Sequence, residues 1–119
     1  MDAEMIRAYC LQKKGVTESF PFDESTLVFK VMDKIFLLMD LYAPQISVNL
    51  KCDPDRAIEL RERYDSVRPG YHMNKKLWNT VTCTGEFSDA EFWAMIDHSY
   101  DEVVKKLTRK TRAELAEMT

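Results

Sequence analysis

Hydrophobic and polar residues alternate with a period of two in three consecutive runs in the middle of the chain. Residues 26–32 and 45–51 alternate, whereas residues 35–42 are apolar on both faces over most of their length. A period of two is that of a β-strand, and an uninterrupted apolar run is typical of a central strand. Only a short turn at 33–34 and a break at Pro44 separate the runs. We therefore expect three neighbouring strands paired antiparallel.

Hydrophobic residues recur every three or four positions in other parts of the chain, which predicts helices. The first helix is capped by Asp2 and runs up to Gly15, which stops it. The second begins at Asp53, with Pro54 in its first turn. Its apolar stripe consists of Ala57, Ile58, Leu60 and Tyr64.

The longest amphipathic stretch follows a capping box, the sequence Ser-Asp-Ala-Glu at residues 88–91. One face of the helix that it opens carries Phe92, Ile96, Tyr100, Val103 and Leu107. We expect a short charged helix after it, over residues 110–117.

The remaining segments complete the predicted fold. Residues 16–25 indicate an ordered loop, and two further strands are expected at 67–68 and 78–84, with a turn at 69–70. The element order predicts one α+β domain over residues 1–119: a two-layer α-β(3)-α-β(2)-α arrangement with one antiparallel five-stranded sheet and helices packed on one face. Alternation leaves a polar set with one large aromatic on the other face: Lys30, Ser47, Asn49, Lys51, Trp78, Thr80 and Thr82.

The composition is that of one compact globular domain. The 119 residues are 45% hydrophobic and 31% charged, which separates the chain from disordered segments. No apolar run approaches the roughly 20 residues of a membrane span, and the acidic N-terminus lacks the order of a signal peptide. We therefore expect a cytoplasmic protein without membrane contact. Cys10, Cys52 and Cys83 form no CxxC pair and are predicted to be free thiols.

The charge is distributed unevenly. The formal net charge of −3 disfavours nucleic-acid binding, since phosphate contacts need a basic surface. Residues 66–85 nevertheless contain Arg68, Lys75 and Lys76 and no acidic residue. Residues 103–113 are also basic without an acid, but they fall at a helix C-terminus, where positive charge offsets the macrodipole.

The loop from residue 68 to residue 78 is the most informative candidate site. It combines charge, hydrogen-bond donors and flat rings in Arg68, Tyr71, His72, Asn74, Lys75, Lys76 and Trp78. Basic residues interleaved with aromatics suit a nucleic-acid backbone, and Lys30, Lys34 and Lys51 extend the patch from the sheet. A structural interpretation stays open, in which residues 69–70 form a turn, the rings pack on the sheet and the lysines are solvated.

Signatures of catalysis are lacking in the sequence, which has no P-loop, no GxGxxG and no GxSxG. Cys52 with His72 or Asp53 has the residue types of a thiolate pair, yet nothing orients the histidine. The histidines and cysteines lie far apart, without the spacing of metal ligands. We expect no enzyme activity, no metal and no cofactor.

Three segments resemble signature segments of the MmcQ/YjbR family: residues 67–81 (VRPGYHMNKKLWNTV), residues 51–54 (KCDP) and residues 97–100 (DHSY). The similarity covers nearly the whole chain, with the elements in the same order. One departure is Leu77, where relatives often carry a histidine before the tryptophan, so no role is expected that needs a histidine at that step. The resemblance implies a fold like that of type III secretion chaperones and DNA binding through a "double wing", two hairpin-like projections offered to a duplex.

The resemblance and the basic loop together predict a non-catalytic DNA-binding protein with duplex DNA as its partner. Arg68, Lys75 and Lys76 would contact phosphates, His72 and Asn74 would contact sugar or backbone, and the tryptophan would brace the loop.

The alternative is a protein- or peptide-binding module, by analogy with secretion chaperones. Its open sheet face would meet a partner or a second copy around Val28, Lys30, Asn49 and Trp78. We expect a monomer or a weak homodimer.

Overall fold

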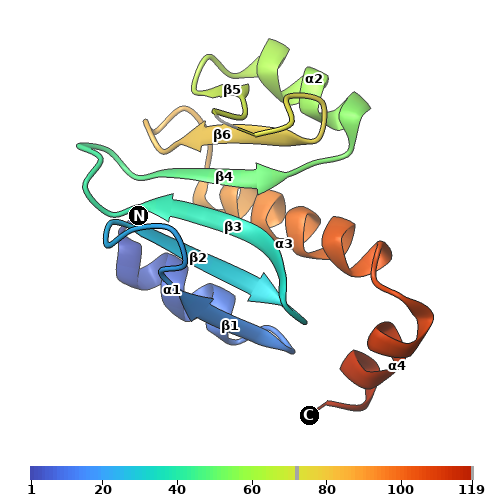
Figure 1. Cartoon of the computed structure of the whole chain (residues 1–119). Coiled ribbons are helices and arrows are strands. Elements are labelled where there is room, and N and C mark those ends of the chain that lie inside the picture. The colour runs from blue at the N-terminus through green and yellow to red at the C-terminus, as the bar shows by residue number, and fades with distance from the viewer. Residues whose placement is uncertain (72, 119) are drawn as a thin grey trace.

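Six strands and four helices make up the part of the chain that the computed structural model describes, residues 1–71 and 73–118. In chain order they are α1 (Ala3–Leu11), β1 (Val16–Ser19), β2 (Thr26–Val31), β3 (Lys34–Asp40), β4 (Ser47–Lys51), α2 (Pro54–Arg63), β5 (Val67–Pro69), β6 (Trp78–Thr82), α3 (Asp89–Lys105) and α4 (Arg109–Glu117). The strands form one antiparallel sheet in the order β1-β2-β3-β4-β6-β5 (Figure 1). The predicted α+β class is therefore confirmed.

The sheet has one strand more than the five predicted. The extra strand is β1, which pairs with β2 in a segment that the sequence predicted to be a loop. That prediction was wrong because β1 is a short edge strand with the sequence Val-Thr-Glu-Ser, and its single apolar residue gives no alternation to detect. Gly15, with a φ of 72°, leads the chain from α1 into β1.

The helices cover one face of the sheet. α1 lies against β1, α3 lies against β2, β3 and β4, and α2 lies beside β5 (Figure 1). α4 follows α3 and packs Leu115 on Gly15, where an added Cβ would lie 2.7 Å from Leu115 Cδ1. None of the described helices is both long enough and apolar enough to cross a bilayer. The core between the layers includes one apolar row that crosses the sheet, formed by Leu27, Met39, Val48, Val81 and Val67.

The helix starts follow from capping chemistry, as predicted. The side chains of Asp2, Asp53 and Ser88 each accept a hydrogen bond from a backbone N–H in the first turn of α1, α2 and α3. The predicted apolar stripe of α2 needs one correction. Ile58 is 51% exposed, because the helix rests on the core through the fully buried Ala57 instead.

The second face of the sheet carries the polar residues that alternation placed there. The register sets Ser47 opposite Thr82, Asn49 opposite Thr80 and Lys51 opposite Trp78. This face is not open throughout, however. Val28 has no exposed surface and Leu38 only 9%, so the β2–β3 part of the face offers little to a partner.

The sheet divides between β3 and β4. These strands pair only from residue 37 to residue 39, while β4 continues as far as Lys51. A β-bulge contributes to the divergence: Phe29 lies opposite Leu37 and Lys30 opposite Ile35, so Phe36 is an extra residue in β3. A bulge bends its strand and increases the local twist, and Figure 1 shows the start of β3 curving away from β4.

Ser99 of α3 joins the two strands where their own pairing ends. Its hydroxyl accepts a hydrogen bond from the Lys51 backbone N–H at 2.8 Å and donates one to the Phe36 carbonyl at 2.5 Å. Ser99 is fully buried. Next to it, the His98 ring accepts a hydrogen bond at Nε2 from the Asp53 backbone N–H, at 3.1 Å. Two consecutive helix residues thus satisfy backbone groups of β3, of the end of β4 and of the N-cap of α2.

Replacing Ser99 by alanine is expected to lower the free energy of unfolding by about 2–3 kcal/mol, because two buried backbone groups lose their partners. Urea unfolding measures the loss, and hydrogen exchange at the Lys51 amide should become faster. Ser19→Ala serves as the control, since Ser19 is exposed on β1 and makes no side-chain hydrogen bond to a described residue. Equal stability of the two variants would show that the Ser99 bridge is unimportant.

His98 is expected to make stability depend on pH below neutrality. Burial, and then the nearby Arg56, lower its pKa in the folded state against the opposing charges of Glu102, Asp53 and Asp101. An ordinary histidine in the unfolded chain has a pKa of about 6.5, so the unfolded state binds the proton more readily. The stabilisation is complete above about pH 6.5 and is lost as the pH falls toward the lower folded pKa.

The test compares the free energy of unfolding of the wild type and of His98→Gln between about pH 7 and pH 5. The wild type should lose more stability over this interval than the variant. Parallel pH profiles would contradict the role of the neutral imidazole.

Candidate functional site

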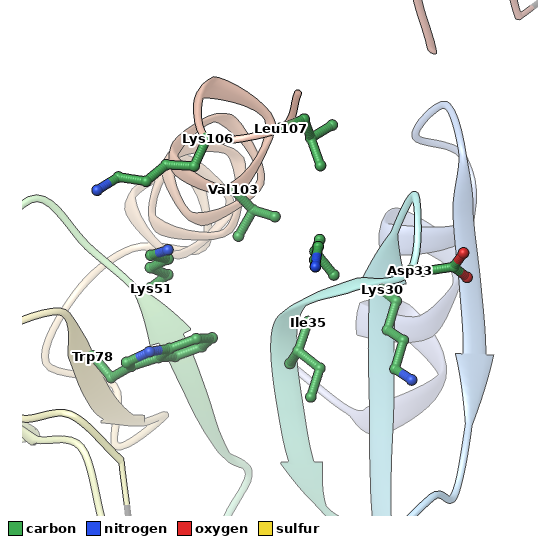
Figure 2. A pocket seen from close by; sticks show the side chains of 9 residues that line it. Lys30, Asp33, Ile35, Lys51, Trp78, Val103, Lys106 and Leu107 are labelled. Atoms are coloured by element: carbon green, nitrogen blue, oxygen red, sulfur yellow. The ribbon is translucent and has the colours of Figure 1, made fainter. Parts of the chain in front are cut away.

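A cleft of about 450 Å³ opens where β3 and β4 part. The β2–β3 hairpin forms one wall, the ends of β4 and β6 form the other, and the C-terminal end of α3 lies across it (Figure 2). We call it the lysine cleft and define it by Lys30, Asp33, Lys34, Ile35, Lys51, Trp78, Val103, Lys106 and Leu107. Sites for small ligands span about 300–1,000 Å³. The cleft is therefore large enough for more than a small ion.

Four lysines line the cleft, one each from β2, β3, β4 and the C-cap of α3, and Figure 2 shows that the side chain of Lys30 points away from Trp78. In the described part of the chain, none of the four forms an ion pair. Lys105 is different, since it pairs with Glu102 at 2.8 Å. Asp33 is the one carboxylate among the lining residues, and Figure 2 shows it pointing away from Trp78. The cleft therefore holds uncompensated positive charge.

Lys51 experiences this charge most directly. Burial lowers the pKa of its ammonium group, and the positive charge of Lys106 lowers it further, with Glu102 acting in the opposite direction. Both main causes disfavour the charged form, through lost hydration and through like-charge repulsion. A bound anion would offset both effects.

Trp78 is fixed by backbone contacts at the start of β6. Its carbonyl accepts hydrogen bonds from the Gly70 N–H at 2.8 Å and from the Arg61 guanidinium at 3.2 Å. Gly70 is required for this approach, because a Cβ there would lie 2.8 Å from Trp78 Cβ. Figure 2 shows the indole extending from β6 beneath Lys51 toward Ile35. The ring thus forms part of the wall of the lysine cleft.

Only some of the candidate residues predicted from the sequence lie together in the structure. Lys30, Lys34, Lys51 and Trp78 come together in the lysine cleft. The remaining described candidates, Arg68, Tyr71, Asn74, Lys75 and Lys76, do not line it. His72 lies outside the described residues.

The described parts of the loop, residues 70–71 and 73–77, make hydrogen bonds to the body of the protein. Arg61 of α2 donates to the carbonyl of Lys75 and, at 2.7 Å, to Asn79 Oδ1. The Tyr71 N–H donates to Thr80 Oγ1 at 3.0 Å. Lys75 donates from Nζ to the Gly70 carbonyl at 3.2 Å, while the Lys76 side chain is exposed.

Sequence reasoning missed three residues that shape the site. Lys106 was assigned to the basic run at a helix end, and only the fold shows that it faces Lys51. Ser99 and Arg61 are polar residues on helices, where the sequence gives no sign that they hydrogen-bond to strand backbone. An analysis of hydrophobic periodicity registers apolar residues, so it passes over a serine and an arginine on the side of a helix that faces the sheet.

The local environment does not favour Cys52 as a nucleophile. Cys52 is only 4% exposed, and burial raises the pKa of its thiol to about 11. An activated cysteine needs a lowered pKa instead. The Asp53 carboxylate is engaged as the N-cap of α2, where it accepts from the Arg56 N–H at 3.1 Å.

Comparison with known proteins gives consistent relatives. Residues 11–102 match the YjbR family model. The chain is 32% identical over 110 residues to the uncharacterized Escherichia coli K12 protein YjbR, covering 92% of this chain and 93% of that protein. It is 35% identical over 107 residues to the uncharacterized Escherichia coli O157:H7 protein YbdF, covering 90% of this chain and 88% of that one.

Solved structures agree with this result. The crystal structure of the Deinococcus radiodurans protein DR2400, which carries a DUF419 domain, aligns with a TM-score of 0.90 at 38% identity over 95% of this chain and 86% of that one. A Pseudomonas syringae protein at 23% identity shares the fold alone, with a TM-score of 0.73 over 86% of this chain and 98% of that one. From the family match and these relatives, the chain belongs to the YjbR family, known also as MmcQ/YjbR.

Proposed function

We propose that this protein binds DNA without catalysis and that the lysine cleft is its main contact surface. The observation that carries the proposal is the presence of four lysines along one cleft, none in an ion pair within the described part of the chain, in a protein whose formal net charge is −3. The acidic composition of the protein does not account for four lysines along one cleft, whereas binding of a polyanion does.

Phosphate binding follows from the electrostatics of the cleft. Lys51 and Lys106 repel one another, and Lys51 is partly desolvated. A phosphate between two ammonium groups replaces that repulsion by two charge-assisted hydrogen bonds. Lysines that neutralise phosphates also release condensed counterions, which adds an entropic gain at low salt.

Three features oppose anion binding: the α3 C-terminus, Asp33 and the Glu102 carboxylate, of which Glu102 is already paired with Lys105. The C-terminal end of α3 presents roughly half a negative charge to the cleft, and Asp33 adds a carboxylate at its rim. Against these stand four full positive charges. With so few cations, we expect a modest affinity that falls steeply with salt.

Removing two cleft charges is expected to weaken DNA binding by roughly tenfold at about 50 mM salt and to reduce the salt slope by about two. The variant is Lys51→Gln with Lys106→Gln, and fluorescence anisotropy with duplex and single-stranded DNA measures it. Lys106 is exposed, Lys51 is half-buried, and neither side chain makes a hydrogen bond within the described structure, so the fold should be kept.

A matched control removes the same charge from the loop at residues 70–77, as Lys75→Gln with Lys76→Gln. It should change the affinity less than about threefold. A large loss in the loop variant with none in the cleft variant would move the contact surface to the loop. The absence of DNA binding by the wild type at low salt would end the proposal.

A protein-binding role is a second candidate, supported at a different place from the sheet face first considered. Two neighbouring loops, after β1 and after β3, expose large hydrophobic side chains at one end of the sheet, where the Leu41 N–H donates to the Ser25 carbonyl at 2.9 Å. These side chains are Phe20, Phe22, Leu41 and Tyr42, the last 78% exposed. Exposed apolar groups of this kind mark interaction surfaces.

If a protein partner binds there, Phe22→Ser with Tyr42→Ser should abolish capture of one stoichiometric partner at both low and high salt. The cleft variant Lys51→Gln with Lys106→Gln should leave that capture unchanged. The reverse result would assign the interaction to the lysine cleft.

A further inference from the structure

The lysine cleft has an apolar part that phosphate contacts do not require. The indole of Trp78 lies beside the lysines, together with Ile35, Val103 and Leu107 (Figure 2). A backbone phosphate needs only positive charge and hydrogen-bond donors. A wall with both a flat ring and ammonium groups fits a ligand that carries a flat ring and an anion, as a nucleotide does.

The two tryptophans of the chain differ in how their rings are used. Trp93 stacks on Tyr9, with ring centroids 4.2 Å apart and planes at 23°, and it also lies 5.8 Å from Phe92. Within residues 1–71 and 73–118, by contrast, no aromatic ring stacks on Trp78. Trp78 is half-buried and lines the lysine cleft, so part of its surface faces the cleft.

The position of Lys51 links the ring to the charge. Lys51 is the cross-strand neighbour of Trp78, and Cβ atoms in such a pair are about 5 Å apart. A base that stacks on the indole therefore carries its own phosphate to within reach of the Lys51 ammonium group. Lys106, at the C-cap of α3, lies near enough to Lys51 for its positive charge to lower the pKa of the Lys51 ammonium group, and Figure 2 shows both above the indole.

We propose that the lysine cleft is a subsite for one unpaired nucleotide, whose base stacks on Trp78 while its phosphate lies between Lys51 and Lys106. This inference rests on the proposed DNA-binding function and specifies its substrate. Bases inside a duplex already stack on both sides, so only an unpaired base offers a free face. The protein accordingly binds single-stranded DNA more tightly than duplex.

The test uses Trp93→Phe, which leaves Trp78 as the only tryptophan reporter. Its fluorescence is followed while three ligands of about 12 nucleotides are added at about 50 mM salt: oligothymidylate, an abasic strand of equal length, and a duplex. Oligothymidylate should quench Trp78 and bind about tenfold more tightly than the abasic strand, because the abasic strand has phosphates but no base to stack.

Two variants at position 78 separate stacking from packing. Because these variants lack the reporter, the fluorescence anisotropy of labelled strands measures their affinity. Trp78→Leu should lose about tenfold in affinity for oligothymidylate and nothing for the abasic strand, whereas Trp78→Phe should keep part of the difference. Circular dichroism confirms that each variant is folded. A loss that is equal for both strands would assign Trp78 a packing role only and overturn the subsite.

The outcomes distinguish this inference from the function on which it rests. Equal affinity for the oligothymidylate and abasic strands, without quenching, would leave backbone binding intact and overturn the base subsite. Tighter binding of the duplex than of oligothymidylate would also overturn it. No binding of any of the three ligands would overturn the proposed function itself.

Discussion

The hydroxyl of Ser99 joins two strands that have stopped pairing with each other. It donates to the Phe36 carbonyl and accepts from the Lys51 N–H, and it is fully buried between them. Without such a bridge, two backbone groups in the core would be unsatisfied, at a cost of about 1–3 kcal/mol each. The bulge in β3 contributes to the divergence, and the serine hydroxyl gives two of the backbone groups at this point a hydrogen-bond partner. The lysine cleft exists because the sheet can divide at this point and remain folded.

The same division determines the charge of the site. Divergent strands place the lysines of the β2–β3 hairpin opposite Lys51, and the helix that supplies Ser99 ends with Lys106 over the gap. Lysines near a helix C-terminus stabilise the macrodipole without any ligand. Lys105 satisfies that role while paired to Glu102, and Lys106 remains unpaired in the described structure and faces the cleft.

Much of the fold could be predicted from the sequence, since period-two and period-3.6 patterns and the caps at Asp2, Asp53 and Ser88 depend on local chemistry. Strand β1 could not be predicted, because a four-residue edge strand with one apolar residue shows no alternation of apolar and polar positions.

Part of the candidate site was also named from the sequence, since Lys30, Lys34, Lys51 and Trp78 were all candidates and all line the lysine cleft. Nothing in the sequence indicated the Arg61 contacts to the Lys75 and Trp78 carbonyls, and the charged side chains of the loop at residues 70–77 remain a predicted contact surface. Lys106 was missed because convergence of distant residues is a property of the tertiary structure.

Amide chemical-shift mapping during titration with a short single-stranded DNA tests most directly whether the lysine cleft is the contact surface. We expect the largest shifts at the Trp78 indole N–H and at the backbone amides of Ile35, Lys51 and Leu107, with the Trp93 indole unchanged. Shifts centred on the loop at residues 70–77, or on Phe22 and Tyr42 at the opposite end of β2 and β3, with the cleft amides unmoved, would contradict it.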